Sequence, residues 1–263
     1  MKVVKHQLSQ DLQYVELHTL ADLHIGDKNC DWELIKENVK KIQDNPNAYC
    51  ILNGDIINNA TKTSISDNYA EMLSPMEQIK LFVDLFEPIK DKILAITSGN
   101  HENRSYKEGV DITDLCATQL GLRHLYAKEG IVIFLRFGKE SRNRHRTGGT
   151  DIRSICYTIY ATHGSGNGRK EGGKINRLAE MASVIDTDIY IHSHTHLPMI
   201  LKEAYFRTDI RNSMVLVVDK LFINTSSSLN YGGYGQMFEF KPNSKQTPVI
   251  YLSGTKKEFT AKL

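Results

Sequence analysis

The chain has 263 residues, of which 40% are hydrophobic and 24% are charged, and its formal net charge is +2. These values exclude a disordered or fibrous protein, and a near-neutral chain has no overall field that draws it to nucleic acid or to a membrane. The four cysteines form no CxxC pair, and no apolar run is long enough for a signal peptide or a membrane span. We therefore expect a soluble cytoplasmic protein with reduced cysteines.

In the first half of the chain, short apolar runs alternate with amphipathic helical patterns. Strands are predicted within 14–24, 48–55 and 92–101, and helices within 31–43, 74–89 and 111–120. Ser74 is expected to cap the second helix, with Pro75 at its first position, and Gly121 stops the third. This β-α-β-α order indicates a mainly parallel sheet that is covered by helices.

The second half is richer in strands. The runs 130–138 and 153–164 flank a polar tip, which is typical of a hairpin. Further strands are predicted at 188–194, 214–227, 236–241 and 248–252, with a short helix at 176–183. The sequence has no linker-like composition shift, internal repeat or low-complexity segment, so we expect a single domain covering 1–263 with two sheets.

Residue types that bind metals follow five of the predicted strands. In chain order they are Asp22 and His24, Asp55, Asn100 and His101, His163, and finally His194 and His196. In open α/β sheets the carboxyl ends of the strands form the crevice where ligands bind. We therefore expect these distant residues to converge.

Imidazole, carboxylate and amide donors without thiolates suit Mn, Fe, Zn or Ni. The carboxylate of Asp55 has two oxygens and can bridge two cations, and two ions about 3.5–4 Å apart activate water and hold both oxygens of an in-line displacement. Gly54 and Gly99 allow tight bends just before ligands. His192 follows an apolar run, so we expect it to pack on the strand or to orient a ligand.

The blocks D-x-H, G-D-x-x-N, G-N-H-E, H-G and H-T-H resemble those of the calcineurin-like metallophosphoesterases, and the resemblance covers about residues 20–230. The resemblance implies an α/β fold, a four-layer α-β-β-α sandwich with two mixed β-sheets and the metal site at the strand C-terminal ends. It also implies two divalent metal ions, with Mn favoured and Fe, Zn or Ni also suitable. The implied first site is Asp22, His24, Asp55 and His196, and the second is Asp55 again with Asn100, His163 and His194.

The same resemblance implies roles around the metals. His101 matches the family histidine that contacts the phosphate and protonates the leaving oxygen, a task that suits imidazole near neutral pH. Arg104 and Asn58 are expected to bind substrate. Two features depart from the family pattern: Ser193 stands where a glycine is usual, and the acidic-arginine-glycine segment that follows the G-D block in Ser/Thr protein phosphatases is absent.

The substrate class is less sharply indicated. Two stretches are basic: 141–149, with Arg142, Arg144 and Arg146, and 164–174. Each is either a solvated loop or a binding site for a phosphate backbone. Tyrosines within 228–235 either stack a base or turn the chain. We favour a phosphodiesterase, either a nuclease or a nucleotide phosphodiesterase, whose partner is a phosphate ester, nucleic acid or nucleotide and not a membrane.

Two alternatives remain open. One is a phosphomonoesterase acting on a small molecule or a phosphoprotein. The other is a non-catalytic scaffold of the same fold, which the presence of all seven ligand positions and His101 disfavours. The sequence predicts no oligomeric state.

Overall fold

The computed structural model describes residues 1–9, 11–62, 64, 71–137, 155–166 and 168–263. The basic stretch 141–149, which the sequence singles out for its arginines, lies outside these described residues. Within the described part of the chain, no helix is long and apolar enough to cross a membrane.

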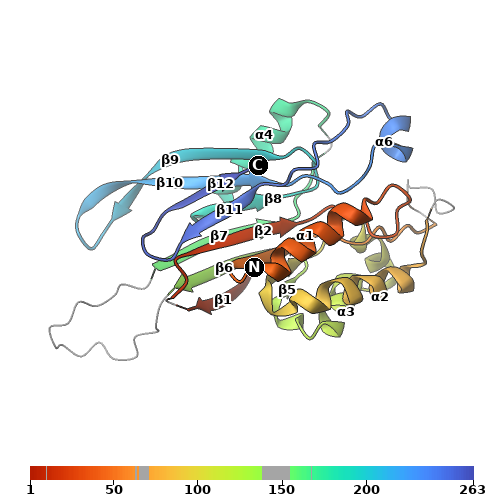
Figure 1. The fold of residues 1–263 in the computed structure, drawn as a ribbon. Coiled ribbons are helices and arrows are strands. Elements are labelled where there is room, and N and C mark those ends of the chain that lie inside the picture. Colours follow the sequence, from red (N-terminus) through yellow and green to blue (C-terminus); the bar gives the residue numbers. More distant parts are fainter. Residues whose placement is uncertain (10, 63, 65–70, 138–154, 167) are drawn as a thin grey trace.

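Among the described residues, sheet A has six strands in the order β1-β6-β7-β8-β10-β9 (Figure 1). Its strands are β1 (Lys2–Leu8), β6 (Gly130–Phe137), β7 (Ile155–Thr162), β8 (Ile189–His192), β9 (Met199–Asp209) and β10 (Met214–Asn224). The β6–β7 and β9–β10 pairs are antiparallel, and the other pairs are parallel. The hairpin predicted from 130–138 and 153–164 is therefore confirmed.

Sheet B has the order β12-β11-β2-β3-β4-β5 in the part of the chain that the structure describes. Its strands are β2 (Tyr14–Leu20), β3 (Ala48–Asn53), β4 (Ile93–Thr97), β5 (Tyr126–Ala127), β11 (Val249–Ser253) and β12 (Phe259–Lys262). Strands β2 to β5 are parallel, whereas β11 is antiparallel to both β2 and β12. Both sheets are mixed, as predicted.

Helices cover the outer faces of the two sheets (Figure 1). Sheet B carries α1 (Trp32–Asp44), α2 (Pro75–Phe86) and α3 (Ile112–Gln119). The 3-10 helices η2 (Glu87–Lys92) and η3 (Glu102–Glu108) lie between α2 and α3 in the chain, and η4 (Arg123–Leu125) follows α3. Sheet A carries α4 (Glu171–Ala179) and α5 (Met181–Val184), whose Leu178 and Met181 pack on Tyr190 and Phe222. The fold is thus the four-layer α-β-β-α sandwich that the family resemblance implies.

Hydrophobic residues of both sheets form the main core. Leu17 and Ile51 of sheet B belong to the same buried cluster as Ile133 and Ile191 of sheet A. Burying such side chains stabilises the folded chain by about 1.5–3 kcal/mol each relative to leaving them exposed. The two sheets are therefore held face to face, with their strand ends fixed relative to one another.

A buried polar network joins the two sheets at the C-terminal ends of their strands. Asn53 donates to the carbonyl of Thr162 (2.9 Å) and to Oγ of Ser193 (2.7 Å), and its Oδ1 accepts from Thr97 (2.8 Å). Because buried amides are stable only when their hydrogen bonds are made, this network fixes the loops after β3, β4, β7 and β8 together.

Two predicted elements need correction. The strand predicted at 236–241 is wrong, because α6 (Gly233–Met237) occupies its start and no strand follows in this segment. Turn hydrogen bonds from Glu239 to Gln236 and from Phe240 to Gly235 curl the segment back on itself. The helix predicted at 176–183 begins earlier, at Glu171, so the last residues of the 164–174 stretch are helical and not a loop.

Candidate metal centre

The predicted ligands stand directly after β2, β3, β4, β7 and β8. Because β2, β3 and β4 are parallel in sheet B and β7 and β8 are parallel in sheet A, these strand ends gather at one edge of the sandwich. Beyond the strands, the N–H of Asp22 donates to Gly54 (3.1 Å) and that of His24 donates to Asp55 (3.0 Å). The loops after β2 and β3 therefore stay in register past the end of the sheet.

The backbone at these positions is unusual. Among the described residues, eight that are not glycine have positive φ, and five of them are predicted ligands: Asp22, His24, Asp55, His194 and His196. Side-chain sterics disfavour this left-handed region, and residues held there cluster at functional sites. The surrounding hydrogen bonds therefore hold a costly conformation that aims these side chains at a common point.

One group of side chains brings ligand atoms of Asp22, His24 and His196 within 4.8 Å of one another. His196 Nε2 lies 3.0 Å from Asp22 Oδ1. His24 is buried, and neither of its ring nitrogens has a hydrogen-bond partner among the described residues. An unsatisfied buried polar atom costs about 1–3 kcal/mol, so an imidazole placed in this way fits a metal ligand far better than a structural residue.

A second group brings ligand atoms of Asp55, His163 and His194 within 4.8 Å of one another. His163 Nε2 lies 3.2 Å from Asp55 Oδ2 and 4.0 Å from Asp22 Oδ1. Its Nδ1 lies 2.8 Å from the carbonyl of Asn53, which fixes the proton on Nδ1. Nε2 is then the nitrogen that faces the carboxylates, as a metal-binding imidazole requires.

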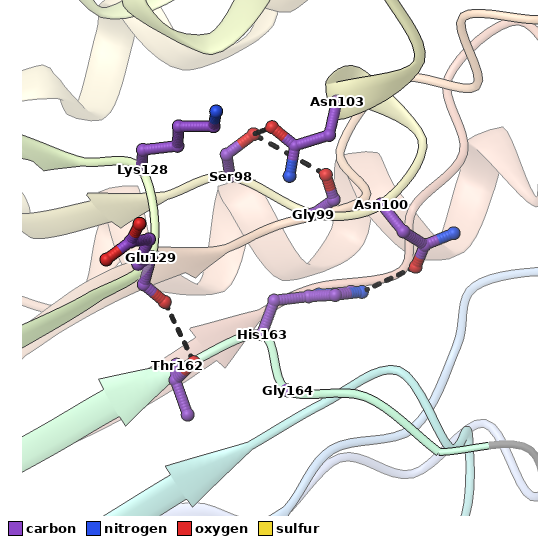
Figure 2. A pocket seen from close by; sticks show the side chains of 9 residues that line it. All are labelled: Ser98, Gly99, Asn100, Asn103, Lys128, Glu129, Thr162, His163 and Gly164. Carbon is purple, nitrogen blue, oxygen red and sulfur yellow. Dashed lines mark hydrogen bonds between the residues drawn. The ribbon is translucent and has the colours of Figure 1, made fainter. Parts of the chain in front are cut away.

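Asn100 connects the histidines of this second group. Its Oδ1 lies 2.7 Å from His194 Nδ1 and 3.3 Å from His163 Nε2, and Figure 2 shows the latter contact. The backbone N–H of His194 donates to Asp22 Oδ2 (3.1 Å), which links the two groups. The structure thus brings all seven predicted donors to one place.

The charges in this cluster favour bound cations. Burial disfavours ionised Asp55, but the neighbouring His163 and His101 hold the pKa of its carboxyl well below the usual range. Burial likewise opposes protonated His163, yet Asp55 and Asp22 raise its pKa to about 10. A proton on His163 therefore supplies the positive charge that the buried carboxylates require, and a divalent cation would displace that proton on binding. The donor set fits divalent metal ions.

Neighbouring atoms of the site lie too close to two backbone positions for any residue other than glycine. A Cβ on Gly99 would lie 2.1 Å from Asp55 Oδ1, and one on Gly54, whose φ is +80°, would lie 2.7 Å from His163 Nδ1. Side chains at these positions would displace the ligands themselves. The expectation that both glycines leave room beside the ligands agrees with this geometry.

His101 stands against the first group of ligands. Its ring centroid lies 4.3 Å from that of His24, and its Nε2 lies 3.8 Å from Asp55 Oδ2. Nδ1 lies 2.8 Å from Asn58 Oδ1 and 3.0 Å from the carbonyl of Asn58, so Nδ1–H donates and Nε2 faces the centre. Burial lowers the pKa of His101 to about 4, with Asp55 acting in the opposite direction and Arg104 in the same direction.

The two predicted substrate-binding residues surround this histidine. Asn58 is buried, and its amide donates to Glu71 while its oxygen holds His101, so its contacts position the imidazole. Arg104 lies 3.1 Å from His101 Nε2 and donates to the carbonyl of Asn58 (2.9 Å). Contact of either residue with substrate stays a prediction.

His192 packs on β8, as the sequence suggests. It is buried, and its Nδ1 lies 2.8 Å from Asn224 Oδ1. The adjacent Ser193 replaces the usual glycine, and its Oγ accepts a hydrogen bond from the amide of Asn53. These two residues support the loop that carries His194 and His196.

A cavity of about 190 Å³ opens beside Asn100 and His163. Figure 2 shows Lys128 and Glu129 on its wall, and Ser98, Asn103 and Thr162 also line it. A cavity of this size accepts a phosphate-sized or small organic group next to the proposed metals.

Glu102, which the sequence does not single out, joins the loop that carries Asp55 to the loop that carries Asn100. Only 3% of this residue is exposed. One carboxylate oxygen accepts the N–H groups of Asp55 (3.0 Å) and Gly99 (2.9 Å), and the other accepts those of Ile56 (2.7 Å) and Ile57 (3.1 Å). Burial and the nearby Asp55 raise the pKa of Glu102 to about 7. The residue fixes the loop of Asp55 to the loop of Asn100.

Replacing Glu102 with glutamine is expected to weaken metal binding about 10–100-fold, the range for residues that support metal ligands. A glutamine amide would point N–H groups at backbone N–H groups that now have an acceptor, so the two ligand loops would separate. Calorimetric titration with Mn²⁺ measures the change. Glu108→Gln, at the exposed end of the same 3-10 helix, is the matched control, and equal affinities in the two variants would contradict the role given to Glu102.

Comparison with solved structures gives similar chains at low identity. A Streptococcus pneumoniae protein described as a predicted phosphoesterase has 13% identity and a TM-score of 0.35, with 95% of this chain and 99% of that chain covered. A double mutant and a single mutant of Vps29 from Entamoeba histolytica each have 13% identity, with TM-scores of 0.41 and 0.40 and coverage of 95% of this chain and 100% of theirs. No curated protein matches this chain.

A family comparison covers most of the chain, including the whole candidate metal centre. The model described as calcineurin-like phosphoesterase matches residues 18–198. This match confirms the resemblance drawn from the D-x-H, G-N-H-E and H-T-H blocks, and it supports a metal-dependent phosphoesterase. The chain therefore belongs to the calcineurin-like phosphoesterase family.

Proposed function

We propose that this phosphoesterase is a binuclear phosphodiesterase that acts on a nucleotide or a nucleic acid. The observation that carries the proposal is a row of overlapping ligand groups: Asp22 with His24 and His196, His24 with Asp55 and His101, and Asp55 with His163 and His194. Asp55 thus lies between the two outer groups, where its two carboxylate oxygens could serve one cation in each.

The proposed metal ligands divide into two sites. Asp22, His24, Asp55 and His196 would hold one ion, and Asp55, Asn100, His163 and His194 the other. When bound, the ions supply positive charge to the phosphoryl oxygens and make water nucleophilic near neutral pH. The donor types favour Mn, with Fe, Zn and Ni as further candidates.

His101 is the proposed general acid. Asn58 holds its Nδ1, which leaves Nε2 directed at the centre, within reach of an oxygen that leaves a phosphorus bound there. A phosphate anion bound beside the ring would favour the imidazolium, in opposition to burial and Arg104. Arg104, next to Nε2, is placed to donate to the same phosphate.

A preference for diesters is supported by groups on the His196 side of the centre. Asn243 reaches His196, with its Nδ2 3.4 Å from Nδ1. On the same segment, the Phe240 ring lies 5.3 Å from the guanidinium of Arg169, and Lys241 pairs with Glu171. Aromatic and cationic groups together suit a nucleotide, because bases stack on rings and phosphates pair with cations. The second ester group of a diester would lie along this side.

A phosphomonoesterase is the alternative function. The 190 Å³ cavity beside Asn100 and His163 favours it, since this volume suits a small substrate better than a polymer. The two functions differ in whether a second ester group is needed for efficient turnover.

The test compares bis-(p-nitrophenyl) phosphate with p-nitrophenyl phosphate in the presence of Mn²⁺. The proposal expects a higher kcat/KM for the diester, because the groups near His196 would bind its second ester. A strong preference for the monoester would contradict the proposal that the protein is a phosphodiesterase. Digestion of single-stranded and double-stranded DNA then tests the nuclease version, and no cleavage at low salt would indicate a small substrate.

We also propose that residues 1–263 form one domain that acts in the cytoplasm. The hydrophobic cluster shared by both sheets supports a single folding unit. The four cysteines are free, with Cys30, Cys50 and Cys116 buried, and this supports a reducing compartment.

A further inference from the structure

Strand β9 is the last strand of sheet A, and in the part of the chain that the structure describes no strand pairs with its outer edge. Among the described residues, the backbone of β9 makes its hydrogen bonds with β10 alone. Figure 1 shows the β9–β10 hairpin reaching beyond the ends of the other strands of the sheet. A long edge strand of this kind offers a row of unpaired N–H and C=O groups to another chain.

The edge and the end of this hairpin also carry exposed apolar side chains. Phe206 is 83% exposed and Ile210 is 90% exposed. Val217, the cross-strand neighbour of Phe206, is 67% exposed, so both members of this pair face solvent. Isolated apolar residues are ordinary on a surface, but a cluster on one projecting arm marks a contact surface.

We propose that β9 pairs with β9 of a second copy of this chain, antiparallel and across a two-fold axis at Tyr205. Antiparallel pairing of two identical strands gives an isologous, closed dimer, in which sheet A continues from one copy into the other. The backbone groups at the edge would then be satisfied without any change in the fold of either copy.

The side chains of β9 select this register. Within one copy, Glu203 accepts from the hydroxyl of Tyr205 (2.8 Å) and Arg207 pairs with Asp186 (2.8 Å). With Tyr205 on the axis, Glu203 also lies opposite Arg207 of the partner subunit, and by symmetry the dimer adds this pair of opposite charges twice. Moving the axis to Phe206 sets Glu203 opposite Asp209 of the partner subunit, two like charges that destabilise a pair. Moving it to Ala204 leaves the charges of Glu203 and Arg207 opposite uncharged side chains.

The same register also pairs the apolar side chains. Phe206 lies opposite Ala204 of the partner subunit, where a large and a small side chain meet on one face. Ile200, which is 37% exposed, lies opposite Ile210 of the partner subunit at the end of the pairing. Other registers would set odd-numbered residues opposite even-numbered ones. In these registers the two facing side chains would point to opposite faces of the sheet. Charge and apolar contacts therefore favour the same axis.

The dimer would leave the candidate metal centre open. β9 begins close to His196 and runs away from it, and a strand of 11 residues spans about 35 Å. The axis at Tyr205 lies near the middle of this strand, and the exposed hairpin end lies farther still from the centre. The inference is thus independent of the proposed function, and a monomeric variant is expected to keep the activity of the wild type.

Sedimentation velocity of the full chain over a range of micromolar concentrations tests the dimer. Wild type is expected to dimerise, and Glu203→Lys is expected to raise the dimer Kd about tenfold or more, because it sets a lysine opposite Arg207 at both symmetric positions. The double change Glu203→Lys with Arg207→Glu is expected to restore the dimer, since the charges are exchanged. Glu37→Lys, the same change of charge at an exposed position of α1, is the control and should dimerise as wild type does.

Cysteine cross-linking tests the axis without depending on the charge variants. Facing residues of antiparallel strands have Cα atoms about 4.5–5.5 Å apart, which suits a disulfide. Tyr205→Cys is expected to form a covalent dimer on oxidation, whereas Thr208→Cys, which lies several residues from its own copy in this register, should not. A monomeric wild type, a dimer that Glu203→Lys leaves unchanged, or equal cross-linking of the two cysteine variants would overturn the proposal.

Discussion

Replacing Asp55 with alanine is expected to remove bound metal and to lower kcat/KM by a factor of about a thousand or more, equivalent to roughly 4 kcal/mol of transition-state stabilisation. Asp55 is fully buried between the two ligand groups, and its Oδ1 also accepts the backbone N–H of His101 (2.8 Å). The variant would lose the shared ligand and the anchor of the catalytic loop together. Metal content by elemental analysis and turnover of the nitrophenyl diester measure both effects.

Thermal unfolding tests the loss of metal binding in Asp55→Ala without a measurement of activity. A ligand present at 100 times its Kd stabilises the folded state by about 2.7 kcal/mol, so Mn²⁺ should raise the Tm of the wild type. It should leave the Tm of Asp55→Ala nearly unchanged. Asp84→Ala, which removes an exposed carboxylate from α2, should respond to Mn²⁺ as the wild type does. An Asp55→Ala variant that retains both ions would exclude Asp55 as a shared ligand.

The convergence of the ligands could be predicted because two simple rules suffice. Asp22, Asp55 and Asn100 each follow a short apolar run, and parallel strands of one sheet end at the same edge. His163 and His194 follow strands of the other sheet, and the buried network of Asn53 brings that sheet's ends alongside. The residue types and their place in the chain thus carry most of the site.

The role of Glu102 could not be predicted from these two rules. A glutamate in a polar loop usually faces solvent, and the sequence gives no sign that four backbone N–H groups surround it. The N–H groups that donate to Glu102 depend on the path of the Asp55 loop, which is set by the left-handed conformation of Asp55 and the turn at Gly54. The glutamate of the G-N-H-E block was the available signal, but only the fold shows what it contacts.

The elements that the sequence does not predict lie at the edges of the sheets. β1, β9 and β12 are all end strands, and charged residues such as Lys5, Lys202 and Lys262 interrupt their apolar runs. Such interruptions hide a short strand from a search for apolar periodicity. In 236–241 the reverse occurs: Phe238 and Phe240, with Glu239 between them, imitate a strand, but local turns and the contact of Phe240 with Arg169 decide its conformation.

Replacing His101 with alanine is expected to lower kcat on the order of 10²–10⁴-fold while both metals remain bound, because general acid catalysis contributes that much and none of the seven proposed ligands is changed. Nε2 of the imidazole lies 3.8 Å from Asp55 Oδ2, and in the proposed mechanism its loss would leave the leaving oxygen without a proton donor. Steady-state kinetics together with metal analysis measures the effect. His124→Ala, at an exposed position, is the matched control and should keep full activity.

The choice of substrate separates proton donation from simple charge stabilisation by His101. A nitrophenolate leaves readily without a proton, whereas the alkoxide of a nucleotide diester does not. If His101 is the general acid, His101→Ala should lose much more activity on a nucleotide diester than on bis-(p-nitrophenyl) phosphate. If the imidazole only stabilises charge on phosphorus, the two losses should be similar. Similar losses would therefore leave His101 at the centre but move its role from the leaving oxygen to the phosphate itself.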